Sequence, residues 1–312
     1  MPIIKIEDIS HVRFAAPDLA KMQAFLEDFG FSCSAQYGRL YGLARDGRPF
    51  AHVTEPGEPA FKALGLRAES LADLEKLAAA EGVAVEPLDD PGAGQVVRLT
   101  DPDGFLVEIV AGQQVSAARP DCLDVPHNNA TARPRLRGTV RLAQGPSHIQ
   151  RIGHCVLNVS DFRTSEKWYK DRFGFLTSDE IEMAPGTSIG AFLRCDRGDQ
   201  PTDHHTVFLA QLPQPTCFLH AAFEVAHLDD LMLGHAHLKS KGRDQAWGVG
   251  RHIMGSQVFD YWRDPWGHEL EHWTDGDLFT ADDPPNKMSF TSLISVQWGT
   301  PHPMLAGQPA AE

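Results

Sequence analysis

The chain has 312 residues, of which 42% are hydrophobic and 22% charged, so it is long enough for two globular domains that each bury a core. Its formal net charge of −14 argues against nucleic acid as a partner, because binding a polyanion requires a basic surface. No run of eighteen apolar residues occurs and the amino terminus lacks the apolar segment of a signal peptide, so we expect a cytoplasmic protein that does not enter a membrane.

The first predicted elements are a strand and a helix in the segment ISHVRFAAPDLAKMQAFLEDFGF, residues 9–31. An apolar strand carrying His11 is followed by an aspartate, and apolar residues then recur at three- and four-residue steps up to Phe-Gly-Phe. Residues 64–82, LGLRAESLADLEKLAAAEG, again predict a strand, a helix and a terminating glycine. The turn and strand DPDGFLVEIV, residues 101–110, close this part of the chain and carry Glu108.

The next stretch, residues 113–149, is rich in Gly, Pro, Arg and Asn and has little periodicity, so we expect a linker there. Beyond it the same plan returns in IGHCVLNVSDFRTSEKWYKDRFGF (152–175), AAFEVAHLDDLMLGHAHLKSKG (221–242) and DPWGHELEHW (264–273). The chain therefore contains an internal repeat, with the same order of elements in both halves. We predict an α+β protein with domains at 1–112 and 150–281, each made of two strand-helix-strand-strand-strand (βαβββ) units, and a proline-rich tail at 282–312.

The second half carries most of the residues that suggest chemistry. They are His154 in GHCVLNV, His204 and His205 in HHTVFLA, His220 in FLHAAFEV, His252 in GRH, Tyr261 in FDYWRDPWG and Glu271 in HELEHW. With spacings of fifteen residues (205 to 220), nine (252 to 261) and ten (261 to 271), this pattern resembles the type I extradiol ring-cleaving dioxygenases of the vicinal oxygen chelate superfamily. The resemblance implies that each domain curls a sheet around a cavity, with the metal in the carboxyl-terminal domain.

Three of these residues form the expected metal-ligand set: His154, His220 and Glu271. Two neutral imidazoles and one carboxylate leave coordination positions open and suit Fe(II), with Mn(II) as the alternative ion. In the first half His11 and Glu108 match His154 and Glu271, but Ala63 stands where the third ligand would be. We therefore expect no metal there.

The resemblance also implies the reaction and the roles of the other residues. A catecholic substrate and dioxygen would meet at the metal, and the ring would open beside the diol in the catabolism of aromatic compounds. His205 would move a proton, whereas His252 and Tyr261 would donate hydrogen bonds to bound substrate and oxygen. Alternation along a strand predicts that His204 points away from His205. We further expect a homo-oligomer.

Two other functions stay open from the sequence. A glyoxalase-like lyase or isomerase of the same superfamily would need a fourth protein ligand, and no clear glutamate or glutamine completes that set. A non-enzymatic ligand-binding protein of this fold would not need a metal at all.

Overall fold

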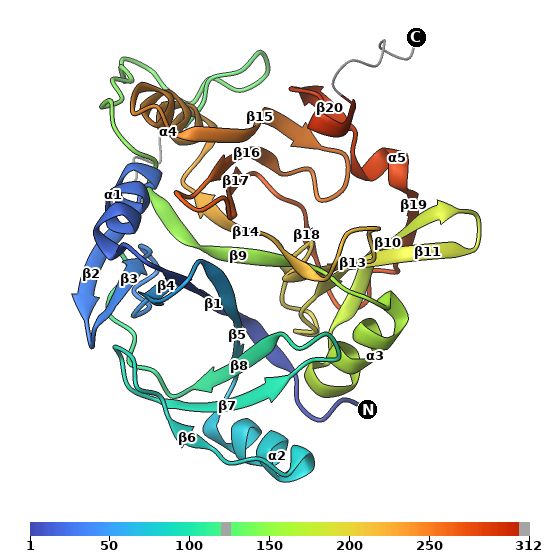
Figure 1. Ribbon diagram of the computed structural model, residues 1–312. Coiled ribbons are helices and arrows are strands. Elements are labelled where there is room, and N and C mark those ends of the chain that lie inside the picture. Colours follow the sequence, from blue (N-terminus) through green and yellow to red (C-terminus); the bar gives the residue numbers. More distant parts are fainter. Residues whose placement is uncertain (120–125, 306–312) are drawn as a thin grey trace.

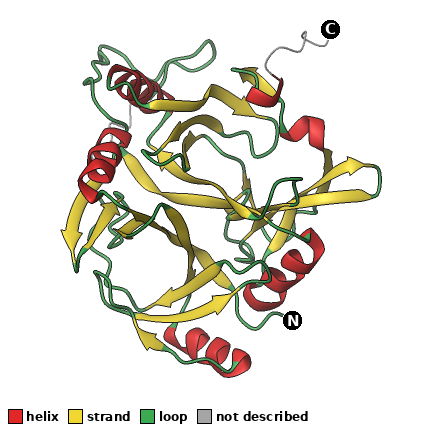
Figure 2. Ribbon diagram, in the orientation of Figure 1, coloured by secondary structure: helices red, strands yellow, loops and turns green. Residues whose placement is uncertain are grey.

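The computed structural model describes residues 1–119 and 126–305 and contains two large sheets that lie side by side with helices on their outer faces (Figures 1 and 2). Parts of the expected linker and tail, residues 120–125 and 306–312, fall outside the described residues. No helix in the described ranges is long and apolar enough to cross a bilayer.

The first sheet has eight strands and covers the amino-terminal half of the chain. In spatial order they are β2 (Ser32–Gln36), β3 (Arg39–Leu43), β4 (His52–Pro56), β1 (Ile6–Ala16), β5 (Ala60–Ala68), β8 (Leu106–Ala111), β7 (Gln95–Thr100) and β6 (Glu86–Pro87). Helices α1 (Leu19–Phe29) and α2 (Leu71–Glu81) connect the strands of each unit. The element order is thus βαβββ twice, as predicted.

The second sheet repeats this arrangement and has ten strands. In spatial order they are β19 (Asn286–Ser289), β10 (Leu176–Ala184), β11 (Thr187–Arg194), β13 (Val207–Ala210), β9 (Ile149–Asn158), β14 (Cys217–Val225), β17 (Glu269–Thr274), β16 (Val258–Arg263), β15 (Asp244–His252) and β20 (Val296–Gly299). Helices α3 (Phe162–Phe173) and α4 (Leu228–Ser240) are the repeats of α1 and α2. The short strands β12 (Thr202–Asp203) and β18 (Leu278–Phe279) pair separately.

The repeated Asp and Phe-Gly-Phe signals have the same structural use in both halves. Asp18 accepts a hydrogen bond from the backbone of Lys21 and starts α1, and Asp161 does the same for α3. Gly30 and Gly174 end these helices with φ of 116° and 71°, a region that side-chain-bearing residues rarely adopt. The sequence repeat therefore encodes the boundaries of equivalent helices.

One hydrophobic core joins the two halves. Strands β1 and β9 run next to each other at the centre of the molecule, where the two sheets meet (Figure 1). Phe31 of the first half packs edge-on against Phe223 of the second, with ring centroids 4.9 Å apart. His272 Nε2 lies 2.7 Å from the carbonyl oxygen of Phe29 and adds a polar contact between the halves. The second sheet therefore packs against the first half on the face that carries Phe223 and His272.

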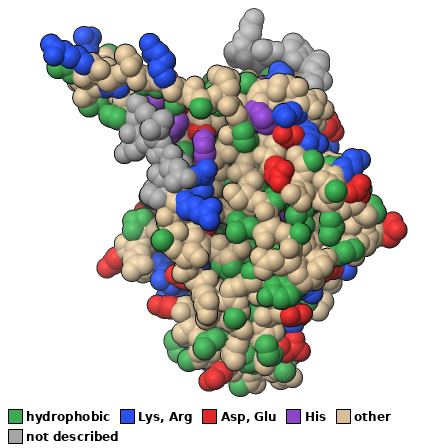
Figure 3. Space-filling model, turned by 90° about the vertical axis from the view of Figure 1, so that its left-hand side faces the viewer, with side chains coloured by type: hydrophobic (Ala, Val, Ile, Leu, Met, Phe, Trp, Pro, Cys, Tyr) green, Lys and Arg blue, Asp and Glu red, His purple; other side chains and the backbone are tan. Residues whose placement is uncertain are grey.

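The connection between the halves has little regular structure. Residues 112–119 and 126–148, between β8 and β9, form no helix or strand, and most of them are exposed. Figure 3 shows Lys and Arg side chains gathered on a protrusion of the surface, whereas acidic and basic side chains are interspersed over the main body.

The carboxyl-terminal segment contacts both edges of the second sheet. Strand β19 pairs in parallel with β10, and β20 pairs antiparallel with β15. Helix α5 (Phe290–Leu293) connects them, and the 3-10 turn η1 (Pro303–Leu305) follows. This segment therefore crosses the open side of the curled sheet from one edge to the other.

Candidate metal centre and active-site cavity

A row of residues across β9, β14 and β17 builds the centre of the site. Ala222 is the register partner of His154 on one side and of Glu271 on the other. Register neighbours point to one face of a sheet, and so does the residue two positions along the strand. His220 therefore shares this face, and the small side chain of Ala222 leaves space between the three larger ones.

The three side chains meet inside the sheet. Glu271 Oε2 lies 3.1 Å from His154 Nε2 and 3.4 Å from His220 Nε2. One ligand atom from each residue falls within 4.8 Å of the others, and no second group of three or more His, Cys, Asp or Glu side chains comes as close within residues 1–119 and 126–305. The residues expected to bind a metal are thus brought together from three strands.

The state of these groups fits a divalent cation. Glu271 Oε1 is buried and accepts no hydrogen bond, which is costly for a carboxylate without a cation. Burial alone would raise the pKa of Glu271, but its contacts with His154, His220 and His252 outweigh it and hold the pKa well below its usual range. Burial lowers the pKa of His154 despite the opposing contact with Glu271. An ionised carboxylate and a neutral imidazole are the forms that bind metal.

Three further proton-bearing groups surround this centre. The ring of His205 lies 4.0 Å from that of His154, centroid to centroid, and burial lowers the pKa of His205 well below its usual value. His252 Nε2 is 3.0 Å from the hydroxyl of Tyr261 and 3.7 Å from Glu271 Oε1. Burial raises the pKa of Tyr261 well above its usual value, so its hydroxyl keeps its proton at neutral pH. All the residues singled out for catalysis therefore lie around the candidate metal centre.

A cavity of about 670 Å³ opens in front of these groups. Its wall includes His154, His205, His220, His252 and Tyr261. The remaining wall is mainly apolar and comes from the second sheet and the carboxyl-terminal segment: Val156, Phe192, Phe208, Leu212, Phe218, Leu219, Trp247, Met254, Phe290, Leu293, Ile294 and Met304. The cavity therefore has room for a small, largely apolar molecule beside the candidate metal centre.

The first half contains the equivalent row without the third ligand. Gly65 is the register partner of both His11 and Glu108, and His11 Nε2 lies 2.9 Å from Glu108 Oε2. A side chain at residue 65 would collide with His11, because an added Cβ would lie 2.2 Å from its Nδ1. Ala63, two residues earlier on β5, takes the position of His220. The sheet register supports the alignment of the two halves made from sequence.

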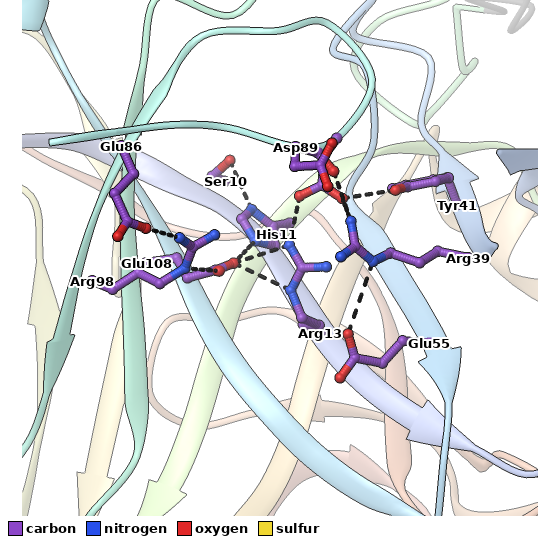
Figure 4. A network of polar contacts seen from close by, with 11 residues as sticks. Ser10, His11, Arg13, Arg39, Tyr41, Glu55, Glu86, Asp89, Arg98 and Glu108 are labelled. Carbon is purple, nitrogen blue, oxygen red and sulfur yellow. Dashed lines mark hydrogen bonds and ion pairs between the residues drawn. The ribbon is translucent and has the colours of Figure 1, made fainter. Parts of the chain in front are cut away.

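Arginines provide the positive charge in this first-half row (Figure 4). Arg13 Nη2 lies 3.1 Å from Glu108 Oε2 and 2.7 Å from Asp90 Oδ2. Arg98 Nε lies 3.0 Å from the other oxygen, Oε1 of Glu108. Burial alone would raise the pKa of Glu108, but His11 and the two arginines lower it well below its usual range. Fixed guanidinium groups thus balance a carboxylate whose counterpart in the second half has none.

This difference predicts one bound metal ion per chain. We expect Glu108→Gln to keep that ion while lowering stability by on the order of 3 kcal/mol, because Arg13 loses a buried partner. Glu271→Gln, the matched change in the second half, should lose the ion. Elemental analysis with thermal unfolding checks both variants; two ions in the wild-type protein, or metal loss in Glu108→Gln, would contradict the prediction.

The structure corrects one expectation and adds one feature. His204 does not point away from His205: their Nδ1 atoms are 3.1 Å apart. The expected alternation fails because both residues precede the strand β13, and His204 lies at a bend. The contribution of the carboxyl-terminal segment to the cavity wall was not expected either, although Phe290, Leu293 and Ile294 have the spacing of one apolar helix face.

Comparisons with known proteins agree with this geometry. The family model described as Glyoxalase/Bleomycin resistance protein/Dioxygenase superfamily matches residues 8–109 and 151–272. The chain is 29% identical to "Metapyrocatechase 2" of Cupriavidus necator, covering 94% of this chain and 89% of the relative, and 25% identical to "Iron-dependent extradiol dioxygenase" of Rhodococcus jostii, covering 88% and 90%.

Among solved structures, the Mn(II)-bound glyoxalase from Novosphingobium aromaticivorans is similar, with a TM-score of 0.76 and 25% identity over 98% of this chain and 96% of that one. The family model covers both repeated halves and includes all six residues of the candidate site. The chain therefore belongs to the glyoxalase/bleomycin resistance protein/dioxygenase superfamily.

Proposed function

We propose that this protein is an extradiol dioxygenase, which uses dioxygen to open the ring of a catechol-type substrate beside its two hydroxyl groups in the breakdown of aromatic compounds. The observation that carries the proposal is the convergence of His154 and His220, which line a largely apolar cavity, with the buried Glu271. Relatives named as a metapyrocatechase and an extradiol dioxygenase support it.

The metal is Fe(II) in this proposal, with Mn(II) as a possible substitute. Two imidazoles and a carboxylate accept either ion. One relative is named iron-dependent, and one similar structure is a Mn(II)-bound protein. When bound, the ion supplies open positions for both oxygens of a catechol and for dioxygen, so that the two reactants meet.

Residues of the protein transfer the proton, donate hydrogen bonds and exclude water. His205 is neutral and lines the cavity, so it can accept a proton from a substrate hydroxyl and return it after ring opening. His252 and Tyr261 donate hydrogen bonds to negative charge that develops on oxygen. The apolar wall excludes water from the reacting atoms.

The cavity wall also restricts the substrate. Among the described residues that line it, Arg263 is the one cation besides the histidines, and its Nη2 lies 3.0 Å from Glu269 Oε1. A carboxylate on the substrate would have to compete with this pair, whereas the apolar wall favours an uncharged alkyl or aryl substituent. Formation of a yellow ring-fission product from such a catechol by the Fe(II)-loaded protein tests the proposal.

The similarity to a Mn(II)-bound glyoxalase makes metal-dependent isomerisation the second candidate. The clustered ligand set has three members, and the nearby Glu269 already contacts Arg263. His205, His252 and Tyr261 also have no assigned purpose in that reaction. A non-enzymatic ligand-binding protein is a weaker candidate, because it would not require a metal-binding set. Turnover of a hemithioacetal without oxygen consumption would favour the glyoxalase.

We also propose a cytoplasmic location and a homo-oligomeric state. Cys33, Cys155, Cys195 and Cys217 are free thiols, and reduced cysteines are typical of a reducing compartment. Exposed apolar side chains such as Leu278 and Met304 could be covered by a second copy. Mass measurement in solution tests the oligomeric state.

Substitution of the two hydrogen-bond donors should separate metal binding from turnover. We expect His252→Phe and Tyr261→Phe to keep their metal and to react about a hundredfold more slowly, because each donor acts on developing charge. Metal content and single-turnover rates of the two variants check this expectation. Wild-type rates in both variants would show that neither group acts on the reaction.

A further inference from the structure

A buried chain of side chains leads from β10 to the proposed proton carrier. Asp179 Oδ2 lies 2.6 Å from His204 Nε2, and His204 Nδ1 lies 3.1 Å from His205 Nδ1. These residues are only 6%, 1% and 4% exposed. Neither Asp179 nor His204 has a role in the proposed reaction, so these contacts have no assigned purpose.

His204, the middle residue of the three, is held in place by its surroundings. The backbone N–H of His204 donates to the carbonyl of Asp277 at 3.0 Å, and the carbonyl of His204 accepts from the Ser178 hydroxyl at 2.6 Å. Its ring lies between Phe192 and Phe279, with centroid distances of 5.1 and 5.5 Å. The imidazole therefore has little freedom to turn away from its two partners.

When both imidazoles are neutral, the two contacts fix which nitrogen carries each proton. A carboxylate can only accept, so His204 donates to Asp179 from Nε2 and is left with a lone pair on Nδ1. That lone pair accepts from His205, which must then carry its proton on Nδ1. A neutral imidazole with a proton on Nδ1 has its lone pair on Nε2, on the opposite side of the ring. His205 lines the cavity, and no described residue forms a hydrogen bond to its Nε2.

We propose that Asp179 and His204 are positioning residues that hold His205 as the Nδ1-protonated tautomer, with Nε2 free as the proton acceptor for substrate. The inference rests on the proposed function, in which His205 carries the proton. An imidazole held in the other tautomer would present a proton, and not a lone pair, to the substrate hydroxyl. The logic is that of a carboxylate that orients a catalytic histidine in a triad, with one more imidazole in between.

A long-range ¹H–¹⁵N spectrum of the full chain supplied with diamagnetic Zn(II) reads the tautomer without any turnover. The signals of His205 are identified by their loss in His205→Phe. We expect protonation on Nδ1 in the wild-type protein and in His204→Asn, whose side-chain oxygen can accept the same hydrogen bond, but not in His204→Leu. A wild-type His205 protonated on Nε2, or an unchanged tautomer in His204→Leu, would overturn the inference. The wild-type measurement decides even if His204→Leu fails to fold.

Kinetics of the Fe(II)-loaded protein provide the second readout. We expect His204→Leu to lower kcat by on the order of tenfold to a hundredfold, because it removes part of an acid–base contribution of about a hundredfold to ten-thousandfold. In a His205→Phe background the same substitution should have no further effect, since it acts through His205. An additive loss would instead mean a structural role and would contradict the inference.

Two comparisons complete the test. His235→Leu removes another histidine with an aspartate contact, 3.1 Å from His235 Nδ1 to Asp260 Oδ2, and should leave kcat unchanged. If His235→Leu slows turnover as much as His204→Leu does, the effect is general destabilisation and the inference fails. If the wild-type protein opens no catechol, the proposed function fails, while the tautomer spectrum still decides the inference.

Discussion

His220→Ala should leave a folded protein that retains no metal and opens no catechol ring. His220 provides one of three clustered ligand atoms, and its ring lies 5.5 Å from that of His154 and 5.0 Å from that of Tyr261, so it contributes to the site more than to the core. Loss of an outer hydrogen-bond partner of a metal site costs about tenfold to a hundredfold in affinity, and loss of a ligand should cost more.

Metal content after gel filtration and the far-ultraviolet circular dichroism spectrum test this expectation together. His302→Ala is the matched control, because His302 also lines the cavity but is not in the ligand group. The control should keep one ion per chain. A fully occupied metal site in His220→Ala would remove His220 from the ligand set.

His205→Phe should have the opposite combination of effects, with normal metal content and a turnover rate lower by about a hundredfold to ten-thousandfold. The ring of His205 lies close to that of His154 but is tilted against it and is not among the clustered ligand atoms, so its loss leaves the metal set intact. Phenylalanine fills a similar volume beside Phe192, whose ring centroid lies 4.7 Å away, and therefore preserves the packing.

Single-turnover measurements separate the two steps that His205 could serve. Substrate binding should be little changed, whereas ring opening should slow, because the proton has no acceptor on the protein. Loss of the metal in His205→Phe would place His205 among the ligands. A wild-type rate of ring opening would show that water or another group carries the proton.

Much of the fold and of the ligand set could be predicted because the chain repeats itself. The Asp and Phe-Gly-Phe signals define equivalent helices, and alternation along β17 separates Glu271, in the ligand set, from His272, which contacts Phe29 of the first half. The first half also showed that Ala63 replaces the third ligand, and the register of Gly65 with His11 and Glu108 agrees with that alignment. These inferences depend on regular strands, whose geometry is local.

The remaining features depend on irregular backbone or on contacts distant in sequence. His204 contacts His205 because a bend precedes β13, and no periodicity describes a bend. Arg13 balances the charge of Glu108 from a position 95 residues earlier in the chain, and sequence alone does not reveal that pairing. The carboxyl-terminal segment becomes cavity wall only because β19 and β20 pair with opposite edges of the sheet.

Oxygen uptake by the purified Fe(II)-loaded protein, measured across monocyclic and bicyclic catechols and in parallel with a methylglyoxal–thiol adduct, tests the central proposal most directly. We predict that at least one catechol with an apolar substituent consumes one dioxygen per molecule and gives a yellow ring-fission product, while the adduct is unchanged. Turnover of the adduct with no oxygen consumed by any catechol would contradict the proposal and assign the site to glyoxalase chemistry.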